Sequence, residues 1–246
     1  MAESSSSEDG NLLSGILRGS LVMSEFDKTP HGFVPQGTLD RIIMKDSILA
    51  AMEIDQPTRE DDLLVDFILK RAKKVFAVSA FIELKSLRRA MLLFKDAYFD
   101  DTNLPIKDTL SRPSETNPSN GNPYAASGAT QNILAFLEQS VTGKIKIWRP
   151  GKIFDFCKHQ WKFLAPVFST DKSNYYLEEA YIIPFVLKYA DFGEGSFGQV
   201  SKYEIHPNHL KDPLKPVRKF SYLFLQALTD PLSGLDRKTT ELWGVS

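Results

Sequence analysis

The sequence predicts an α+β protein that is mostly α, with a helical N-terminal domain followed by a β-hairpin. Apolar residues recur at intervals of three and four between Leu64 and Phe76, which is the spacing of one helix face. A second helical stretch is expected at about 82–98. Closer to the C-terminus, the segments 181–189 and 199–205 are rich in β-branched and aromatic residues and enclose several glycines. That arrangement is typical of two strands joined by a turn.

Composition places the chain among ordinary soluble proteins. Of its 246 residues, 42% are hydrophobic and 25% are charged, and the net charge is −1. This balance gives no strong field for nucleic acid or a membrane surface, and no apolar run approaches the roughly 20 residues that cross a bilayer. The polar, acidic first ten residues do not form a signal peptide, and the single cysteine suits a reducing compartment. We therefore expect a cytoplasmic or nuclear protein with no nucleic-acid or membrane partner.

Prolines, glycines and changes in polarity indicate where segments begin and end. The expected segments are 1–32 as a disordered or mixed N-terminal region, 33–110 as a helical domain, 111–130 as a flexible linker, 131–180 as a helical extension packing on the N-terminal domain, 181–228 as an incomplete small lobe with strands, and 229–246 as an unstructured tail.

Helix starts are expected at three residues of the 33–110 domain. Thr38 and Asp46 are placed to cap two short helices, and Thr58 to cap the clearest helix of the chain. Acidic residues follow Thr58 in the first turn, and the basic run 70–74 comes later, which complements the helix dipole. We interpret that basic run as the solvated face of the helix and not as a binding patch.

Cysteine and histidine offer two further sites to consider. Cys157 lies on the apolar side of a helix expected over 153–164, without a basic partner at helical spacing, so we interpret it as a buried structural thiol and not a nucleophile. His206 and His209 loosely resemble a metal pair, but no cysteine or further histidine lies nearby. We expect no metal site.

The stretch with a chemical mechanism attached is Asp191-Phe-Gly-Glu-Gly-Ser-Phe-Gly-Gln-Val200, which fits the glycine-rich loop of protein kinases. A backbone folded over nucleotide phosphates has no room for a Cβ atom, and some of its turn positions need positive φ. The small and apolar residues between the last two glycines would form the tip, and the final valine would cover the base. The candidate ATP-binding residues are Gly193, Glu194, Gly195, Ser196, Phe197, Gly198 and Val200.

The residues after the loop separate the alternatives. A dinucleotide-binding loop opens a helix, whereas Gln199 to Ile205 alternates as a strand and ends at Pro207. The phosphate loop of the other large nucleotide-binding class is excluded because no Gly-Lys-Ser/Thr follows. A glycine-containing hairpin without a ligand stays open as an alternative.

The resemblance to kinases extends beyond the loop. Residues 193–205 look like the opening hairpin of a protein kinase small lobe, and the sequence before them is similar to the helical N-terminal region of a group of fungal protein-kinase-domain proteins. The segments that carry the second similarity are 33–43, 64–76, 155–168 and 183–185.

The resemblance implies a C-terminally truncated kinase of the serine/threonine type. Its full-length relatives would bind ATP with magnesium and transfer the γ-phosphate to protein. Lys219 is the candidate for the lysine of the third strand, which holds the phosphates. The chain contains no His-Arg-Asp and no Ala-Pro-Glu, and Asp191-Phe-Gly overlaps the glycine loop. We therefore expect no catalytic residue, no metal ligand and no kinase activity from this chain alone.

A second function class stays open beside the first. The helices of residues 36–100 would then form a non-enzymatic interaction or signalling module that binds a protein partner, and the C-terminal hairpin would be an appendage. Finding His-Arg-Asp and Asp-Phe-Gly motifs downstream in the coding sequence would favour the kinase hypothesis.

Overall fold

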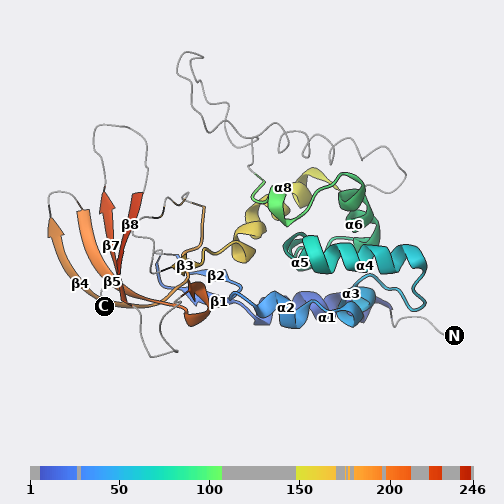
Figure 1. Ribbon diagram of the computed structural model, residues 1–246, viewed down its shortest axis with the longest axis horizontal. Coiled ribbons are helices and arrows are strands. Elements are labelled where there is room, and N and C mark those ends of the chain that lie inside the picture. Colours follow the sequence, from blue (N-terminus) through green and yellow to red (C-terminus); the bar gives the residue numbers. More distant parts are fainter. Residues whose placement is uncertain are drawn as a thin grey trace, which may run out of the picture. The chain divides into compact units, whose positions relative to one another are not determined.

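The computed structural model describes residues 6–26, 29–106, 148–169, 175, 177, 180–195, 198–211, 222–228 and 239–244. It shows an α+β protein in which helix outweighs strand, as the sequence predicts. The chain divides into two compact units (Figure 1). The helical unit consists of Met1–Gly19 and Leu39–Gln160, and the β unit consists of Ser20–Thr38 and Trp161–Ser246.

The helical unit is built from short helices around one apolar core. Its described elements are α1 (Ser6–Gly19), α2 (Thr38–Ile42, which starts at the unit boundary), α3 (Lys45–Ala51), α4 (Arg59–Arg71), α5 (Lys73–Phe81), α6 (Leu87–Asp96), the 3-10 turn η1 (Asp101–Asn103) and α8 (Pro150–His159). Helix α5 is buried from Val75 to Phe81, because α1, α4, α6 and α8 all pack against it.

The start of α4 follows the capping rule expected from the sequence. The Thr58 main-chain N–H donates to the Asp61 carboxylate at 2.9 Å, and the Asp61 N–H returns a bond to the Thr58 hydroxyl. This reciprocal pair satisfies two N–H groups that the first helical turn leaves without partners. Thr58 is therefore confirmed as the cap of the clearest helix.

Aromatic rings fill the end of the helical core near α6 and α8. The Phe94 ring, fully buried, lies 5.0 Å from the Phe99 ring, 5.3 Å from Trp148 and 6.1 Å from Phe156 between centroids. Offset and edge-to-face contacts of this kind add to the free energy gained by burying the rings. Cys157, on the same helix as Phe156, is buried, as expected for a structural thiol.

The β unit contains an antiparallel sheet and two small strand pairs. Its elements are β1 (Val22–Ser24), β2 (His31–Phe33), the 3-10 turn η4 (Gln160–Phe163, which starts at the unit boundary), β3 (Phe168–Ser169), β4 (Phe185–Gly195), β5 (Gly198–Ile205), the 3-10 turn η5 (Pro207–His209), β6 (Leu210–Lys211), β7 (Tyr222–Leu228) and β8 (Thr239–Gly244). The four-stranded sheet has the order β4-β5-β7-β8 with every neighbouring pair antiparallel (Figure 1).

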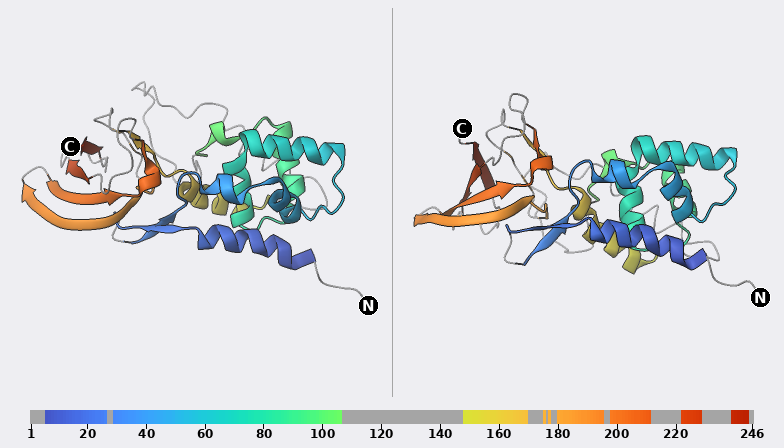
Figure 2. Two further views of the ribbon diagram at one scale, coloured as in Figure 1. Left: turned by 60° about the horizontal axis from the view of Figure 1, so that its bottom comes forward. Right: turned by 90° about the horizontal axis from the view of Figure 1, so that it is seen from below.

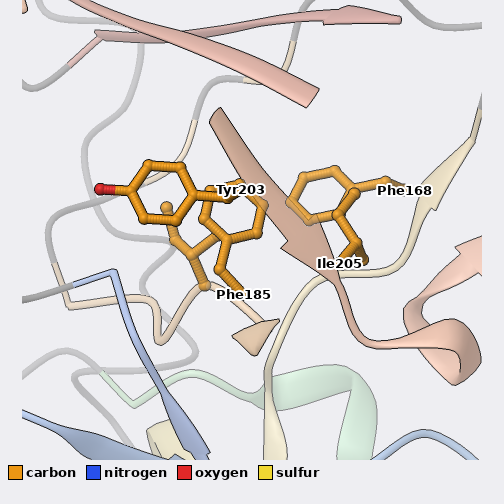
Figure 3. Close-up of a cluster of buried hydrophobic side chains, with 5 residues drawn as sticks. Phe168, Phe185, Tyr203 and Ile205 are labelled. Carbon is orange, nitrogen blue, oxygen red and sulfur yellow. The ribbon is translucent and has the colours of Figure 1, made fainter. Parts of the chain in front are cut away.

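A cluster of buried side chains lies at the base of the β4–β5 hairpin (Figure 3). The rings of Phe185 and Tyr203 stack with centroids 4.8 Å apart, and Phe168 stacks on Phe185 at 6.4 Å. Phe26, from the N-terminal part of the chain, meets the edge of Phe185 at 5.6 Å. The segment 20–38 therefore supplies part of the packing around the hairpin.

Several boundaries differ from the sequence expectation. Residues 6–19 form α1 within the segment expected to be disordered or mixed, and 239–244 form β8 within the expected unstructured tail. The side-by-side pairing of β8 with β7 gives its backbone the hydrogen bonds that the isolated sequence could not predict. The extension expected over 131–180 divides at Gln160, beyond which the chain belongs to the β unit.

Helix boundaries inside the 33–110 domain also differ. The helix expected from Thr58 to Phe76 ends at Arg71, and a separate helix starts at Lys73. Asp46 does not cap α3. That helix starts at Lys45, two residues before the expected Ser47, and the Met44 N–H donates to the Ser47 hydroxyl at 2.9 Å. The expected linker 111–130 lies outside the described residues.

Candidate functional site: the glycine hairpin

The candidate site is the end of the hairpin formed by β4 and β5, drawn in orange in Figure 2 as a long curved ribbon. The alternating apolar pattern that predicts two strands is realised in an antiparallel ladder from Phe185↔Ile205 to Gly195↔Gly198. Pro184 stands just before β4, where a missing N–H does not interrupt the ladder.

The sequence-predicted residues converge on this end of the hairpin. Gly193 pairs with Val200, Glu194 with Gln199, and Gly195 with Gly198. Ser196 and Phe197, between the strands, lie outside the described residues. The glycine stretch therefore lies at the end of two paired strands, as the sequence predicts, and Gly195 pairs with Gly198.

The pairing of β4 with β5 shifts register at three places between Phe185 and Gly193. They fall between Phe185 and Leu187, between Lys188 and Asp191, and between Asp191 and Gly193. At each shift β4 carries one residue more than β5 opposite it, which is the count of a β-bulge. Bulges strengthen the local twist of a strand, and this accounts for the curvature of the ribbon in Figure 2.

Side-chain contacts join β4 and β5 in the part of the hairpin that lies away from the glycines. The Tyr189 hydroxyl donates to the Glu204 carboxylate at 2.9 Å across the two strands, and the Lys188 ammonium lies 5.9 Å from the centre of the Tyr203 ring. Below them the buried Phe185–Tyr203 stack anchors both strands. The two strands that lead to the glycines therefore start from a well-packed cluster of side chains.

The third strand of the sheet departs from the kinase pattern. In kinases this strand carries the lysine that holds the phosphates. Here the third strand is β7, whose sequence Tyr-Leu-Phe-Leu-Gln-Ala-Leu contains no lysine, and the residue opposite Val200 is Gln226. Lys219 precedes β7 and lies outside the described residues. β7 therefore does not supply the lysine that the resemblance to kinases implies.

The ring nitrogens of His206 and His209 form hydrogen bonds within the fold. His209 is buried, its Nε2 accepts from the Gln36 N–H at 3.0 Å, and its Nδ1 lies 2.8 Å from the Pro166 carbonyl oxygen. His206 Nδ1 accepts from the Asn208 N–H at 3.2 Å. A metal would have to displace these bonds, and within the described ranges no three His, Cys, Asp or Glu side chains gather as metal ligands.

The strongest electrostatic feature of the helical unit is a capping network. The Thr58 hydroxyl and N–H, together with the Arg88 guanidinium at 2.6 Å, lower the pKa of Asp61 to about 2. Arg88 also donates to Glu60 at 3.0 Å. These residues lie at the starts of α4 and α6 and join the two helices, so we interpret this network as structural. The sequence signals identify Thr58 but not Arg88, which is 27 residues from Asp61.

A second carboxylate caps a helix from a distance. Asp101 accepts from the N–H groups of Lys74 and Val75 at 3.0 Å and 2.9 Å, at the start of α5. Ala72, the cap position of α5, has no side chain that could do this. Burial raises the pKa of Asp101. No local sequence signal could have found this contact, because the carboxylate comes from η1.

Comparisons with protein-family models, with curated proteins and with solved structures found no match for this chain. Of the helices that the structure describes, none combines the length and apolar character needed to cross a bilayer.

Proposed function

We propose that this chain is a catalytically incomplete, protein-kinase-like protein whose β4–β5 hairpin binds the phosphates of ATP through its backbone. The observation that supports the proposal is that Gly193, Gly195 and Gly198 lie together in the last antiparallel pairs of the β4–β5 ladder. Side chains are absent at those positions, so main-chain N–H groups can approach phosphate oxygens closely.

The same proposal assigns no phosphoryl transfer to the chain. The charge of the transferring phosphoryl group is stabilised by metal ions and by the residues that hold them, and the sequence contains no His-Arg-Asp block to supply base and metal ligands. Magnesium would enter with ATP. The lone buried Cys157 is in keeping with a location in the cytoplasm or nucleus.

Calorimetric titration with ATP, with and without magnesium, tests the proposal. We expect saturable binding to residues 1–246 and a loss of about tenfold or more in affinity for Gly195→Val, corresponding to at least about 1.4 kcal/mol. Gly151→Val is the matched control, because a Cβ atom at Gly151 would meet nothing within 4 Å. If the well-folded chain binds no ATP, or if both variants bind equally, the hairpin is a structural element without a nucleotide.

The alternative function, a protein-interaction module within residues 36–100, is supported by a separate observation. Met44 and Leu63 are exposed by 56% and 54%, and they adjoin Lys45 and Asp62, which form an ion pair of 2.9 Å between the starts of α3 and α4. If these side chains form one contiguous apolar patch, that patch would be a site for a protein partner.

Site-specific photo-crosslinking tests this alternative. A photoreactive phenylalanine at position 44 is expected to give a discrete crosslinked product in cells, while the same residue at position 53, where Glu53 is exposed, gives none. Equal labelling from both positions would mean that no specific partner covers the surface. This outcome is independent of the ATP titration.

A further inference from the structure

Helices α4 and α5 are separated by a single residue, although the sequence that forms them contains no helix breaker. Residues 59–81 include neither glycine nor proline. The break falls on Ala72, with φ −131° and ψ 31°, and alanine has the highest helix propensity of all residues. Fully buried apolar residues keep helical spacing across the break, namely Leu64, Ile68, Ala72, Val75 and Phe76. The local sequence therefore favours one continuous helix, and contacts from elsewhere must impose the break.

Main-chain hydrogen bonds run up to the break from both sides. The Ala72 N–H donates to the Ile68 carbonyl at 3.1 Å, as the next residue of α4 would. The Ala72 carbonyl accepts from the Phe76 N–H at 2.9 Å, as the first residue of α5 would. A change of Ala72 from its present dihedral angles to the helical values of about −63° and −42° would therefore join the two helices at one residue.

The turn η1 supplies the contacts that hold the break. Asp101 accepts from the N–H groups of Lys74 and Val75 at 3.0 Å and 2.9 Å. In a continuous helix these two groups would donate to the carbonyls of residues 70 and 71. The buried carboxylate of Asp100 pairs with Arg71, the last residue of α4, at 2.5 Å. The two neighbouring carboxylates thus bind one helix end each.

We propose that Asp101 keeps the chain monomeric, and that without its cap residues 59–81 form one helix while two copies exchange the parts of the chain that precede Ala72. Straightening within a single copy would pull α4 away from α6, on which it packs and to which the Asp61–Arg88 bond of 2.6 Å joins it. A second copy restores these contacts, because the part before Ala72 of each copy packs on the part after Ala72 of the other. The junction then decides between the monomer and the exchanged dimer.

The size of the effect follows from the number of junctions. An exchanged dimer contains two continuous helices, so a change at the junction counts twice in its dissociation constant. Removing Asp101 takes two hydrogen bonds from the monomer and none from the continuous helix, and a typical helix cap changes an equilibrium constant about fivefold. We therefore expect the dissociation constant to fall about tenfold or more.

Sedimentation equilibrium of the full chain at concentrations up to about 1 mM, the order of the effective concentration within one chain, tests the proposal. Each sample is refolded from urea at its final concentration, because exchange requires the contacts across the junction to open. Asp101→Ala should dimerise about tenfold or more tightly than the natural chain. Asp66→Ala is the matched control, because this exposed carboxylate of α4 pairs with Lys70 outside the contacts of η1. It should leave the dissociation constant unchanged.

Two further measurements identify exchange through a continuous helix. Adding Ala72→Gly to Asp101→Ala should weaken the dimer about tenfold or more, because glycine destabilises both continuous helices and fits the broken conformation. In dimers mixed from an isotope-labelled and an unlabelled copy, nuclear Overhauser effects are expected between α4 of one copy and α6 of the other. A dimer formed through an outer surface would not give them.

The proposal is wrong if folded Asp101→Ala stays monomeric up to about 1 mM, or if it dimerises no more tightly than Asp66→Ala. It is equally wrong if the mixed dimer gives no effect between α4 and α6 of different copies. If Asp101→Ala does not fold, Arg71→Ala removes the other contact of η1 at an exposed guanidinium and should shift the equilibrium in the same direction. A monomeric Arg71→Ala would then overturn the proposal. None of these outcomes depends on whether the chain binds ATP.

Discussion

The two units of this protein are held by contacts of different range. In the helical unit, α4 begins with a bond between Thr58 and Asp61, three residues apart. In the β unit, the buried Ser24 hydroxyl donates to the Ile183 carbonyl at 2.6 Å across 159 positions, and the Gln36–His209 bond spans 173. The β unit therefore forms only when the segment 20–38 meets a part of the chain much further along.

This difference indicates that the β4–β5 hairpin does not fold independently of the segment 20–38. The β4 strand starts at Phe185, whose carbonyl accepts from the Glu25 N–H at 2.8 Å and whose ring meets Phe26. Contacts of high sequence separation carry a larger loop-closure cost than a helix cap does. The base of the candidate site thus depends on the distant segment 20–38, whereas α4 is capped by residues of its own first turn.

The largest effect is expected from truncating the core of the β unit. Phe185→Ala removes a fully buried ring that stacks on Tyr203 and Phe168, and we expect a loss of about 3–5 kcal/mol in the free energy of unfolding of that unit. Hydrogen exchange of the His206 N–H, which donates to Pro184, measures the loss.

Phe94→Ala is the matched change in the helical unit, where Phe94 is equally buried. We expect it to raise exchange at the Ile82 N–H, which donates to Val78, more than at His206. If each variant raises exchange at both amides to the same extent, the two units unfold as one and the comparison fails.

The next effect compares one long-range bond with one local bond. Ser24→Ala leaves the Ile183 carbonyl without its buried donor, and we expect a cost of about 1–3 kcal/mol. Thr58→Ala removes the cap of α4, with an expected cost of about 1 kcal/mol. Urea unfolding measures both. A smaller effect for Ser24→Ala than for Thr58→Ala would show that the long-range bond is not what holds the segment 20–38.

The difference between local and long-range contacts also explains how far the sequence could predict the structure. The cap Thr58 and the two strands β4 and β5 are set by residues close in sequence, and each is confirmed. The end of α4 at Arg71 could not be predicted in this way, because α5 begins anew with N–H groups that Asp101 caps from η1. The strand β8 depends likewise on its pairing with β7.

The candidate site shows the same limit. The glycine pattern predicts the turn because three glycines and the flanking alternation lie within thirteen residues, Gly193 to Ile205. The identity of the third strand depends on which later segment pairs with β5, and the resemblance to kinases implied that Lys219 would lie on it. The strand that pairs is 222–228, which has no lysine. Nucleotide binding by the hairpin stays a prediction.

Two carboxylates of the helical unit should respond to acid in opposite directions. The Asp61 pKa is lowered to about 2, so the stability it contributes is complete above its ordinary 3.8 and is lost as the pH falls from there toward 2. The Asp101 pKa is raised by burial, so protonation of Asp101 adds stability as the pH falls through its folded pKa toward 3.8.

Urea unfolding between about pH 7 and about pH 2 separates the two contributions. Asp61→Asn should cost about 1–2 kcal/mol near neutral pH and flatten the decline of stability in acid. Asp101→Asn should make that decline steeper. If both variants change the slope in the same direction, the two carboxylates do not have the opposite environments that their partners indicate.

The smallest effect concerns a helix end where a residue other than glycine has positive φ. Tyr98 follows α6 with φ 53° and an exposed side chain, and Tyr98→Gly should stabilise the helical unit by about 0.5–1 kcal/mol because glycine adopts this conformation freely. Glu83 has the same φ, but its carboxylate accepts from Ser14 at 3.1 Å and pairs with Arg18 at 3.3 Å. Glu83→Gly should therefore gain little, because the relief of strain is offset by the lost contacts. Thermal unfolding measures both variants. An equal gain in both would mean that the contacts of Glu83 contribute nothing, and the helical unit would then depend on local backbone preferences even more than the capping of α4 indicates.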